Sequence, residues 1–173
     1  NKLITDLIDL DHLQENMYTL NAEPIAIVQL FLDTLALFDI RINEKKLKTE
    51  LDIHEDLVVT GDPKRLQQVF YNLLDNAIKY SSEESYIKMT LTEENKQLLF
   101  RLNNMGNEIS EDDLAHIGER FFRTDKARSR MTGGTGLGIS IVKEIVRLHE
   151  GEFTISSDKS NGTTVTVLLP GLL

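Results

Sequence analysis

The sequence has no cysteine, no long apolar run and no excess of basic residues, and each absence removes a class of function. Without cysteine, disulfide bonds, thiolate zinc sites and cysteine nucleophiles are excluded, and the composition suits a reducing compartment. No apolar run approaches the roughly 20 residues of a membrane-spanning helix, so we expect a soluble domain without direct membrane contact. The net charge of −9 disfavours a nucleic-acid partner, because nucleic-acid binding usually needs a basic surface.

The composition is that of a globular domain with an appendage at its start. With 173 residues, 40% of them hydrophobic and 27% charged, the chain can bury one ordinary core. The first residues form a helical seam with alternating steps of four and three, made of Leu3, Leu7, Leu10, Gln14 and Met17. About two heptads do not hold a helix alone, so it needs a partner from outside the chain or a preceding segment. We therefore expect an appendage over 1–18 and one domain over 19–173.

Hydrophobic periodicity predicts an α+β protein. Pro24 fits the first turn of a helix that runs to about residue 38, and Asp62 with Pro63 starts a second that ends near residue 80. A short helix covers 110–117 and a longer one 137–150. Alternating patterns predict strands at 47–53, 57–59, 87–91, 98–102, 153–157 and 165–169. We expect a two-layer α/β sandwich in which a mostly antiparallel sheet packs on about three helices.

Two asparagines on the second of these helices attract attention. Asn72 and Asn76 lie four residues apart, so they are neighbours on one helical face at the border of the apolar stripe. Asparagine is a poor residue in mid-helix, and its neutral oxygen can bind a cation. The alternative is that both are solvated amides that bind nothing.

A glycine-rich stretch precedes the last predicted helix. Residues 133–138 read GGTGLG, and glycines before a helix let backbone N–H groups approach an anion, which the helix dipole also attracts. The spacing is neither that of a Walker loop nor that of a dinucleotide fingerprint. The transition into an apolar helix favours phosphate binding over a flexible linker.

Five segments in order resemble the N, G1, F, G2 and G3 boxes of sensor histidine kinase ATP-binding domains. They read LQQVFYNLLDNAIKYS, NMGNEIS, ERFFR, TGGTGLGIS and GTT, and they lie within residues 62–169. Residues 1–18 resemble the end of the second dimerisation helix of that family. The resemblance implies a Bergerat-type fold with a mobile ATP lid, and ATP and Mg2+ as cofactors.

The resemblance also implies roles for individual residues. Asn76 matches the Mg2+ ligand, Asn72 its partner facing the phosphates, Lys79 a phosphate-contacting base and Tyr80 an aromatic against adenine. The other positions that match nucleotide-binding residues are Asn104, Gly106, Arg123, Arg130, Gly134, Gly136, Leu137, Gly138, Thr163 and Thr164.

The sequence departs from the family pattern at three positions. Asn104 replaces the aspartate that accepts a hydrogen bond from the adenine amino group, Glu108 replaces the second G1 glycine, and Gly118 replaces the first F-box phenylalanine. Some relatives, including vancomycin-sensor-like kinases, resemble the asparagine variant. We expect weaker discrimination of adenine with nucleotide binding retained.

The implied function is transfer of the γ-phosphoryl group of ATP to a histidine on the dimerisation domain, and from there to a response regulator. The parent protein is then a homodimer anchored in the bacterial membrane, with this domain cytoplasmic. The four histidines of the chain lie outside the family's phosphoacceptor context, so we expect no self-phosphorylation. They are His12, His54, His116 and His149.

Two other functions remain open. A degenerate domain could act as a regulatory scaffold without nucleotide, a reading that only the G1 departures favour. The second alternative is that the chain is a clamp ATPase or a serine kinase of the same fold. Clamp ATPases activate water with a glutamate, whereas Gln68 fills the nearest position here and cannot accept a proton.

Overall fold

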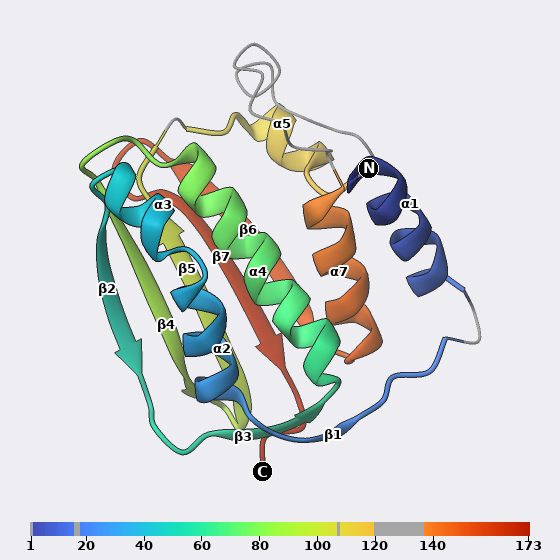
Figure 1. Ribbon diagram of the computed structural model, residues 1–173. Coiled ribbons are helices and arrows are strands. Elements are labelled where there is room, and N and C mark those ends of the chain that lie inside the picture. Colours follow the sequence, from blue (N-terminus) through green and yellow to red (C-terminus); the bar gives the residue numbers. More distant parts are fainter. Residues whose placement is uncertain (1, 16–17, 107, 120–136) are drawn as a thin grey trace.

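The computed structural model describes residues 2–15, 18–106, 108–119 and 137–173. They form two layers, with a five-stranded sheet behind a row of helices (Figure 1). The strands, in spatial order, are β2 (Lys48–Ile53), β4 (Tyr86–Glu94), β5 (Gln97–Asn104), β7 (Gly162–Leu169) and β6 (Glu152–Asp158). The helices are α1 (Lys2–Leu13), α2 (Ile27–Ala36), α3 (Asp39–Glu44), α4 (Pro63–Tyr80), α5 (Glu111–His116) and α7 (Gly138–Leu148). The predicted α+β sandwich is confirmed.

The sheet is mostly antiparallel, as predicted, with β2 and β4 as its one parallel pair. Along β5, Leu98, Phe100 and Leu102 are buried on one face, while on the other face Leu99 is buried and Arg101 is exposed. Successive side chains of a strand point to opposite faces, so the first three face the helices and Arg101 faces solvent. β5 lies in the middle of the sheet, between β4 and β7.

Three phenylalanines join the two layers. Phe31 of α2, Phe70 of α4 and Phe100 of β5 have ring centroids 5.0–5.3 Å apart, in tilted or edge-to-face arrangements. These separations are in the preferred range for aromatic pairs, which contribute beyond the area they bury. The cluster fixes how α4 lies on the sheet.

Local signals set both ends of α4. The carboxylate of Asp62 accepts a hydrogen bond from the N–H of Arg65 at 3.3 Å, and Pro63 occupies the first turn, as the sequence predicts. At the other end, the ammonium of Lys45 donates to the carbonyls of Ile78 and Lys79 at 2.7 and 2.8 Å. A cation at the last carbonyls satisfies unpaired acceptors and complements the helix dipole.

The sequence-based prediction for Pro24 is wrong. Pro24 lies in β1 (Glu23–Ala26), which pairs antiparallel with β3 (Val58–Gly61) in a separate two-stranded sheet. Pro24 pairs with Thr60, whose N–H donates to the carbonyl of Gly171 and not to β1, so the missing N–H of Pro24 costs no bond between the two strands. The helix begins at Ile27, and a break at Leu37–Phe38 separates α3 from it. Phe38 is buried on the same stripe, so the apolar period continues through the break and conceals it.

The first helix packs against α7 of its own chain (Figure 1). Its buried residues are Asp6, Leu10 and Leu13, whereas Leu3 of the predicted seam is 39% exposed. Leu7 is half-buried and Gln14 exposed, and Met17 lies outside the described residues. The buried stripe is therefore rotated from the predicted one. Within the described ranges, no helix is long and apolar enough to cross a bilayer.

Candidate functional site

One face of α4 carries the polar residues that the sequence singles out. Asn72, Asn76, Lys79 and Tyr80 are all half-buried and follow one another at steps of four, three and one. Residues three and four apart on a helix are neighbours, so these side chains line one strip of α4. The strip borders the buried stripe that packs on the sheet.

This strip lies beside the start of α7. The side-chain N–H of Asn72 donates to the carbonyl of Gly138 at 3.2 Å. A Cβ placed on Gly138 would lie 4.0 Å from the same nitrogen, so the two elements are in close contact there. The end of the predicted phosphate loop and Asn72 are thus brought together, with Asn76 one turn further along α4.

Asn76 differs from Asn72 in its partners. Within the described part of the chain, no group hydrogen-bonds to the carboxamide of Asn76. Asn72 uses its N–H for Gly138, which leaves its oxygen as an acceptor. Two amide oxygens on neighbouring turns are therefore available to a ligand.

Lys79 belongs to a chain of charges along α4. Its ammonium lies 3.1 Å from one oxygen of Asp75, and the guanidinium of Arg41 lies 2.8 Å from the other. Two cations on one carboxylate leave a net charge of about +1 in a strongly acidic domain. These cations also line a cavity of about 280 Å3, whose walls are Arg41, Glu44, Lys45, Ile78, Lys79 and Glu83. Lys79 thus belongs to both the strip and the cavity, but neither asparagine of the strip lines the cavity.

The chain after β5 is fastened to the end of α4. Ser81 and Gly106 form a β-bridge, and the N–H of Ser82 donates to the carbonyl of Met105 at 2.9 Å. A Cβ on Gly106 would overlap the carbonyl oxygen of Tyr80. Gly106 is therefore required by a close backbone approach, which brings the predicted base-binding residues Tyr80 and Asn104 to the same end of the sandwich.

Asn104 is the last residue on the buried face of β5. It pairs with Ile87 of β4 and with Thr163 of β7, and only 9% of its surface is exposed. Thr163 lies on the same face of the sheet, whereas Thr164 lies on the opposite face and accepts a hydrogen bond from the side chain of Asn103 at 2.8 Å. The structure thus brings Thr163, but not the side chain of Thr164, toward Asn104.

Several predicted residues lie outside the described ones, namely Arg123, Arg130, Gly134 and Gly136. Leu137 is fully buried at the start of α7. Besides Asn104, two positions differ from the family pattern: Glu108 is exposed, and Gly118 has a φ of +94°. The carbonyl of Gly118 accepts a hydrogen bond from Ser140 of α7 at 2.7 Å, so this glycine joins the end of α5 to α7.

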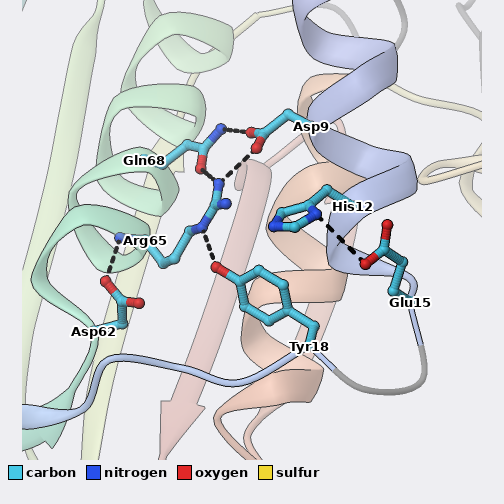
Figure 2. A network of polar contacts seen from close by, with 7 residues as sticks. All are labelled: Asp9, His12, Glu15, Tyr18, Asp62, Arg65 and Gln68. Carbon is cyan, nitrogen blue, oxygen red and sulfur yellow. Dashed lines mark hydrogen bonds and ion pairs between the residues drawn. The ribbon is translucent and has the colours of Figure 1, made fainter.

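Sequence reasoning missed a polar network at the N-terminal end of α4 (Figure 2). The guanidinium of Arg65 contacts Asp9 of α1 at 2.7 Å, the hydroxyl of Tyr18 at 2.8 Å and the side-chain oxygen of Gln68 at 3.0 Å. Gln68 in turn donates to Asp9 at 2.6 Å. The side chain of Arg65 is only 8% exposed. No local pattern signals a contact between residues 56 positions apart.

This network fixes the charge of Arg65 and the orientation of Gln68. Burial opposes the charged guanidinium, but its hydrogen bonds to Asp9 and Tyr18 raise the pKa of Arg65 above its usual value. Both ends of the Gln68 amide are used by the network. Gln68, which matches the catalytic glutamate of clamp ATPases most nearly in the sequence, therefore has a structural role: it links α4 to Asp9 of α1.

His149 ties the end of α7 to the start of α4. Its Nε2 accepts a hydrogen bond from the N–H of Asp62 at 3.0 Å, and its Nδ1 lies 2.8 Å from the carbonyl of Ile145. This pattern requires a neutral ring with the proton on Nδ1. Burial lowers the pKa of His149 and so favours the same neutral state.

The chain matches known proteins over this whole region. The family of histidine kinase-, DNA gyrase B-, and HSP90-like ATPases matches residues 61–172. The sensor histidine kinase WalK of Bacillus subtilis is 34% identical over 172 residues, which are 98% of this chain and 28% of that protein. The sensor protein VanS of Enterococcus faecium is 44% identical over 118 residues, 68% of this chain and 30% of that protein.

A solved structure has the same fold. The catalytic domain of the histidine kinase ThkA superposes with a TM-score of 0.78 at 28% identity, over 88% of this chain and 97% of that domain. The chain spans about a quarter to two-fifths of the curated relatives that it matches over nearly its whole length. The chain therefore belongs to the family of histidine kinase-, DNA gyrase B- and HSP90-like ATPases, and within it to the ATP-binding catalytic domains of sensor histidine kinases.

Proposed function

We propose that the domain binds Mg-ATP between α4 and the start of α7 and donates the γ-phosphoryl group to a histidine on a separate helical domain. The observation that carries this proposal is the contact between Asn72 and Gly138. It brings two neighbouring amide oxygens of α4 to the N-terminal end of α7, where a helix dipole attracts phosphate.

The donor set fits magnesium. Mg2+ prefers oxygen ligands and keeps several waters, so one carboxamide oxygen together with phosphate oxygens suffices. Asn76 offers such an oxygen, and it has no competing partner in the described part of the chain. Asn72 then faces the phosphates from the preceding turn. The metal would neutralise charge on the triphosphate as the phosphoryl group is transferred.

Lys79 supplies positive charge beside the metal. Its side chain is 20% exposed, and its ammonium shares Asp75 with Arg41, so the carboxylate does not cancel both cations. A phosphate oxygen can take up a donor of Lys79 while Arg41 keeps Asp75 in place. This arrangement offsets the acidic charge of the domain at the point where the triphosphate binds.

The base would lie at the end of the sandwich near Tyr80, Asn104 and Thr163. Gly106 permits the close approach that creates this end. The side chain of Tyr80 provides an aromatic surface for the purine ring, and Asn104 provides hydrogen bonds to its edge. We leave the side chain of Thr164 out of the site, because it lies on the far face of the sheet.

The same proposal extends to the parent protein. Residues 1–18 are the end of a dimerisation helix, and 19–173 form the catalytic domain. The phosphoryl group passes from the phosphoacceptor histidine of a homodimer to a response regulator, and the parent is anchored in the bacterial membrane with this domain in the cytoplasm. The names of relatives, a sensor histidine kinase and a signal transduction histidine-protein kinase, support the transfer to histidine.

Thermal unfolding with and without Mg-ADP tests nucleotide binding. A ligand at about one hundred times its dissociation constant stabilises a folded protein by about 2.7 kcal/mol. We expect this stabilisation in the wild type and its loss in Asn76→Ala. The matched control is Asn43→Ala, which removes an exposed asparagine from α3 and should keep the full shift. No shift of the wild type at millimolar nucleotide would instead favour the regulatory scaffold.

A further inference from the structure

Asn104 is a buried amide that has no hydrogen-bond partner among the residues that the structure describes. Only 9% of its surface is exposed. A buried amide that makes no hydrogen bond is unfavourable in the free protein, so such a group indicates a ligand that completes it. Asn104 lies two residues before Gly106, where the chain after β5 meets the end of α4. This place at the predicted base-binding end makes the ligand the nucleotide base, a step that rests on the proposed function.

The backbone of Asn104 is held firmly although its amide is not. β5 is paired on both sides at this residue, with Ile87 and Thr163. A Cβ on Gly162 would overlap the carbonyl oxygen of Asn104, so the β6–β7 hairpin packs directly against it. The hydroxyl of Thr163 is engaged with Ser157 at 2.9 Å. The amide is thus placed accurately, while nothing in the described structure determines which of its two ends faces the ligand.

The neighbouring residue shows the opposite arrangement. The side-chain nitrogen of Asn103 donates to the carbonyl of Asn161 at 2.6 Å and to the hydroxyl of Thr164 at 2.8 Å. These bonds fix the orientation of its amide on the outer face of the sheet. Two adjacent asparagines therefore differ in whether the amide can turn over.

An amide that can turn over matches two kinds of purine edge. Adenine presents a donor at N6 and an acceptor at N1, and a 6-oxopurine presents an acceptor at O6 and a donor at N1. The oxygen and nitrogen of a carboxamide pair with either edge after a rotation of about 180°. A carboxylate only accepts hydrogen bonds, so one that faces the substituent at C6 pairs with the amino group of adenine and repels O6 of a 6-oxopurine. We propose that Asn104 makes the base subsite accept 6-oxopurine nucleotides as well as adenine nucleotides.

Calorimetric titrations with Mg-ATP and with the magnesium complex of inosine triphosphate test this proposal. Inosine triphosphate carries the 6-oxo edge without the extra amino group of guanine, so it changes only the edge in question. We expect the wild type to bind both nucleotides with dissociation constants within about tenfold of each other. In Asn104→Asp we expect inosine triphosphate to weaken relative to ATP by roughly tenfold or more, the discrimination typical of a base-edge pair.

The control is Asn103→Asp, which makes the same chemical change at the adjacent residue on the opposite face. Its ratio of the two dissociation constants should equal that of the wild type. Binding of ATP without binding of inosine triphosphate by the wild type would overturn the inference and leave the proposed function intact. An unchanged ratio in Asn104→Asp would also overturn it. If neither nucleotide bound, the proposed function itself would fail.

Discussion

The two ends of α4 carry polar side chains that are satisfied in opposite ways. At the N-terminal end, Arg65 and Gln68 use their hydrogen-bonding groups within the protein (Figure 2). Toward the C-terminal end, the amide of Asn76 has no partner in the described part of the chain, and neither has that of Asn104 on β5. Satisfied buried polar groups hold a structure together, whereas unsatisfied ones cost stability and mark sites for ligands. The difference predicts a graded set of effects on the free energy of unfolding without nucleotide.

The largest loss should follow Arg65→Ala. Removal of the guanidinium leaves the carboxylate of Asp9 without its partner at a mostly buried contact between α1 and α4. We expect a loss of about 3 kcal/mol, measured by urea unfolding. Lys64→Ala removes an exposed cation from the same turn and should change stability by less than about 0.5 kcal/mol. Equal effects of the two substitutions would show that the network does not stabilise the domain.

A smaller loss is expected for Asp62→Ala. Its carboxylate caps α4 through Arg65 and accepts a second hydrogen bond from the N–H of Asn21 at 3.1 Å. Loss of a helix cap costs about 1–2 kcal/mol, and the second bond points to the upper part of that range. Ser110→Ala removes the cap of the short α5, where no residue is buried, and should cost less. Thermal unfolding of the two variants measures the difference, and a reversed order would contradict the role of Asp62.

The effect of His149 depends on pH. Because burial lowers the folded-state pKa of His149, the unfolded chain binds more protons once the pH falls below about 6.5. Its contribution is therefore fully present above about pH 6.5 and is lost as the pH falls toward the folded-state pKa. The slope for one proton reaches at most about 1.4 kcal/mol per pH unit. In urea unfolding between pH 7.5 and 5, the free energy of unfolding of His149→Gln should lack this pH-dependent component. If the free energies of the variant and the wild type changed in parallel with pH, the prediction would be refuted.

The smallest effect, and of opposite sign, is expected for Asn76→Ala. No described group hydrogen-bonds to this amide, and alanine has the higher helix propensity by roughly 0.5 kcal/mol. The variant should therefore be as stable as the wild type or slightly more stable in thermal unfolding without nucleotide. A loss above about 1 kcal/mol would show that Asn76 stabilises the fold, and that the two ends of α4 do not differ in the way described above.

Much of the fold follows from local pattern. The alternation along β5 and the Asp62–Pro63 start of α4 each depend on a few neighbouring residues, so the sequence predicts them. The asparagines of α4 stand out because their residue type conflicts with a helix interior. Gly106 could be assigned to the site only through the resemblance, and its physical reason, the close approach of Tyr80, needs the folded chain.

The rest depends on contacts between distant segments. Asp9 and Arg65 each look like an ordinary exposed charge until α1 packs against α7 and brings Asp9 to Arg65 of α4. The pairing of β1 with β3 likewise overrides the helical signal at Pro24. The link from Lys79 through Asp75 to Arg41 joins α4 to α3, a helix that hydrophobic periodicity does not separate from α2.

A crystal structure of the domain with Mg2+ and a non-hydrolysable ATP analogue tests the central claim most directly. The account predicts the side-chain oxygen of Asn76 about 2.1 Å from the metal, with the phosphates between α4 and the start of α7. A triphosphate bound elsewhere, for example in the cavity beside Arg41 and Lys45, with Asn76 touching neither metal nor phosphate, would contradict it.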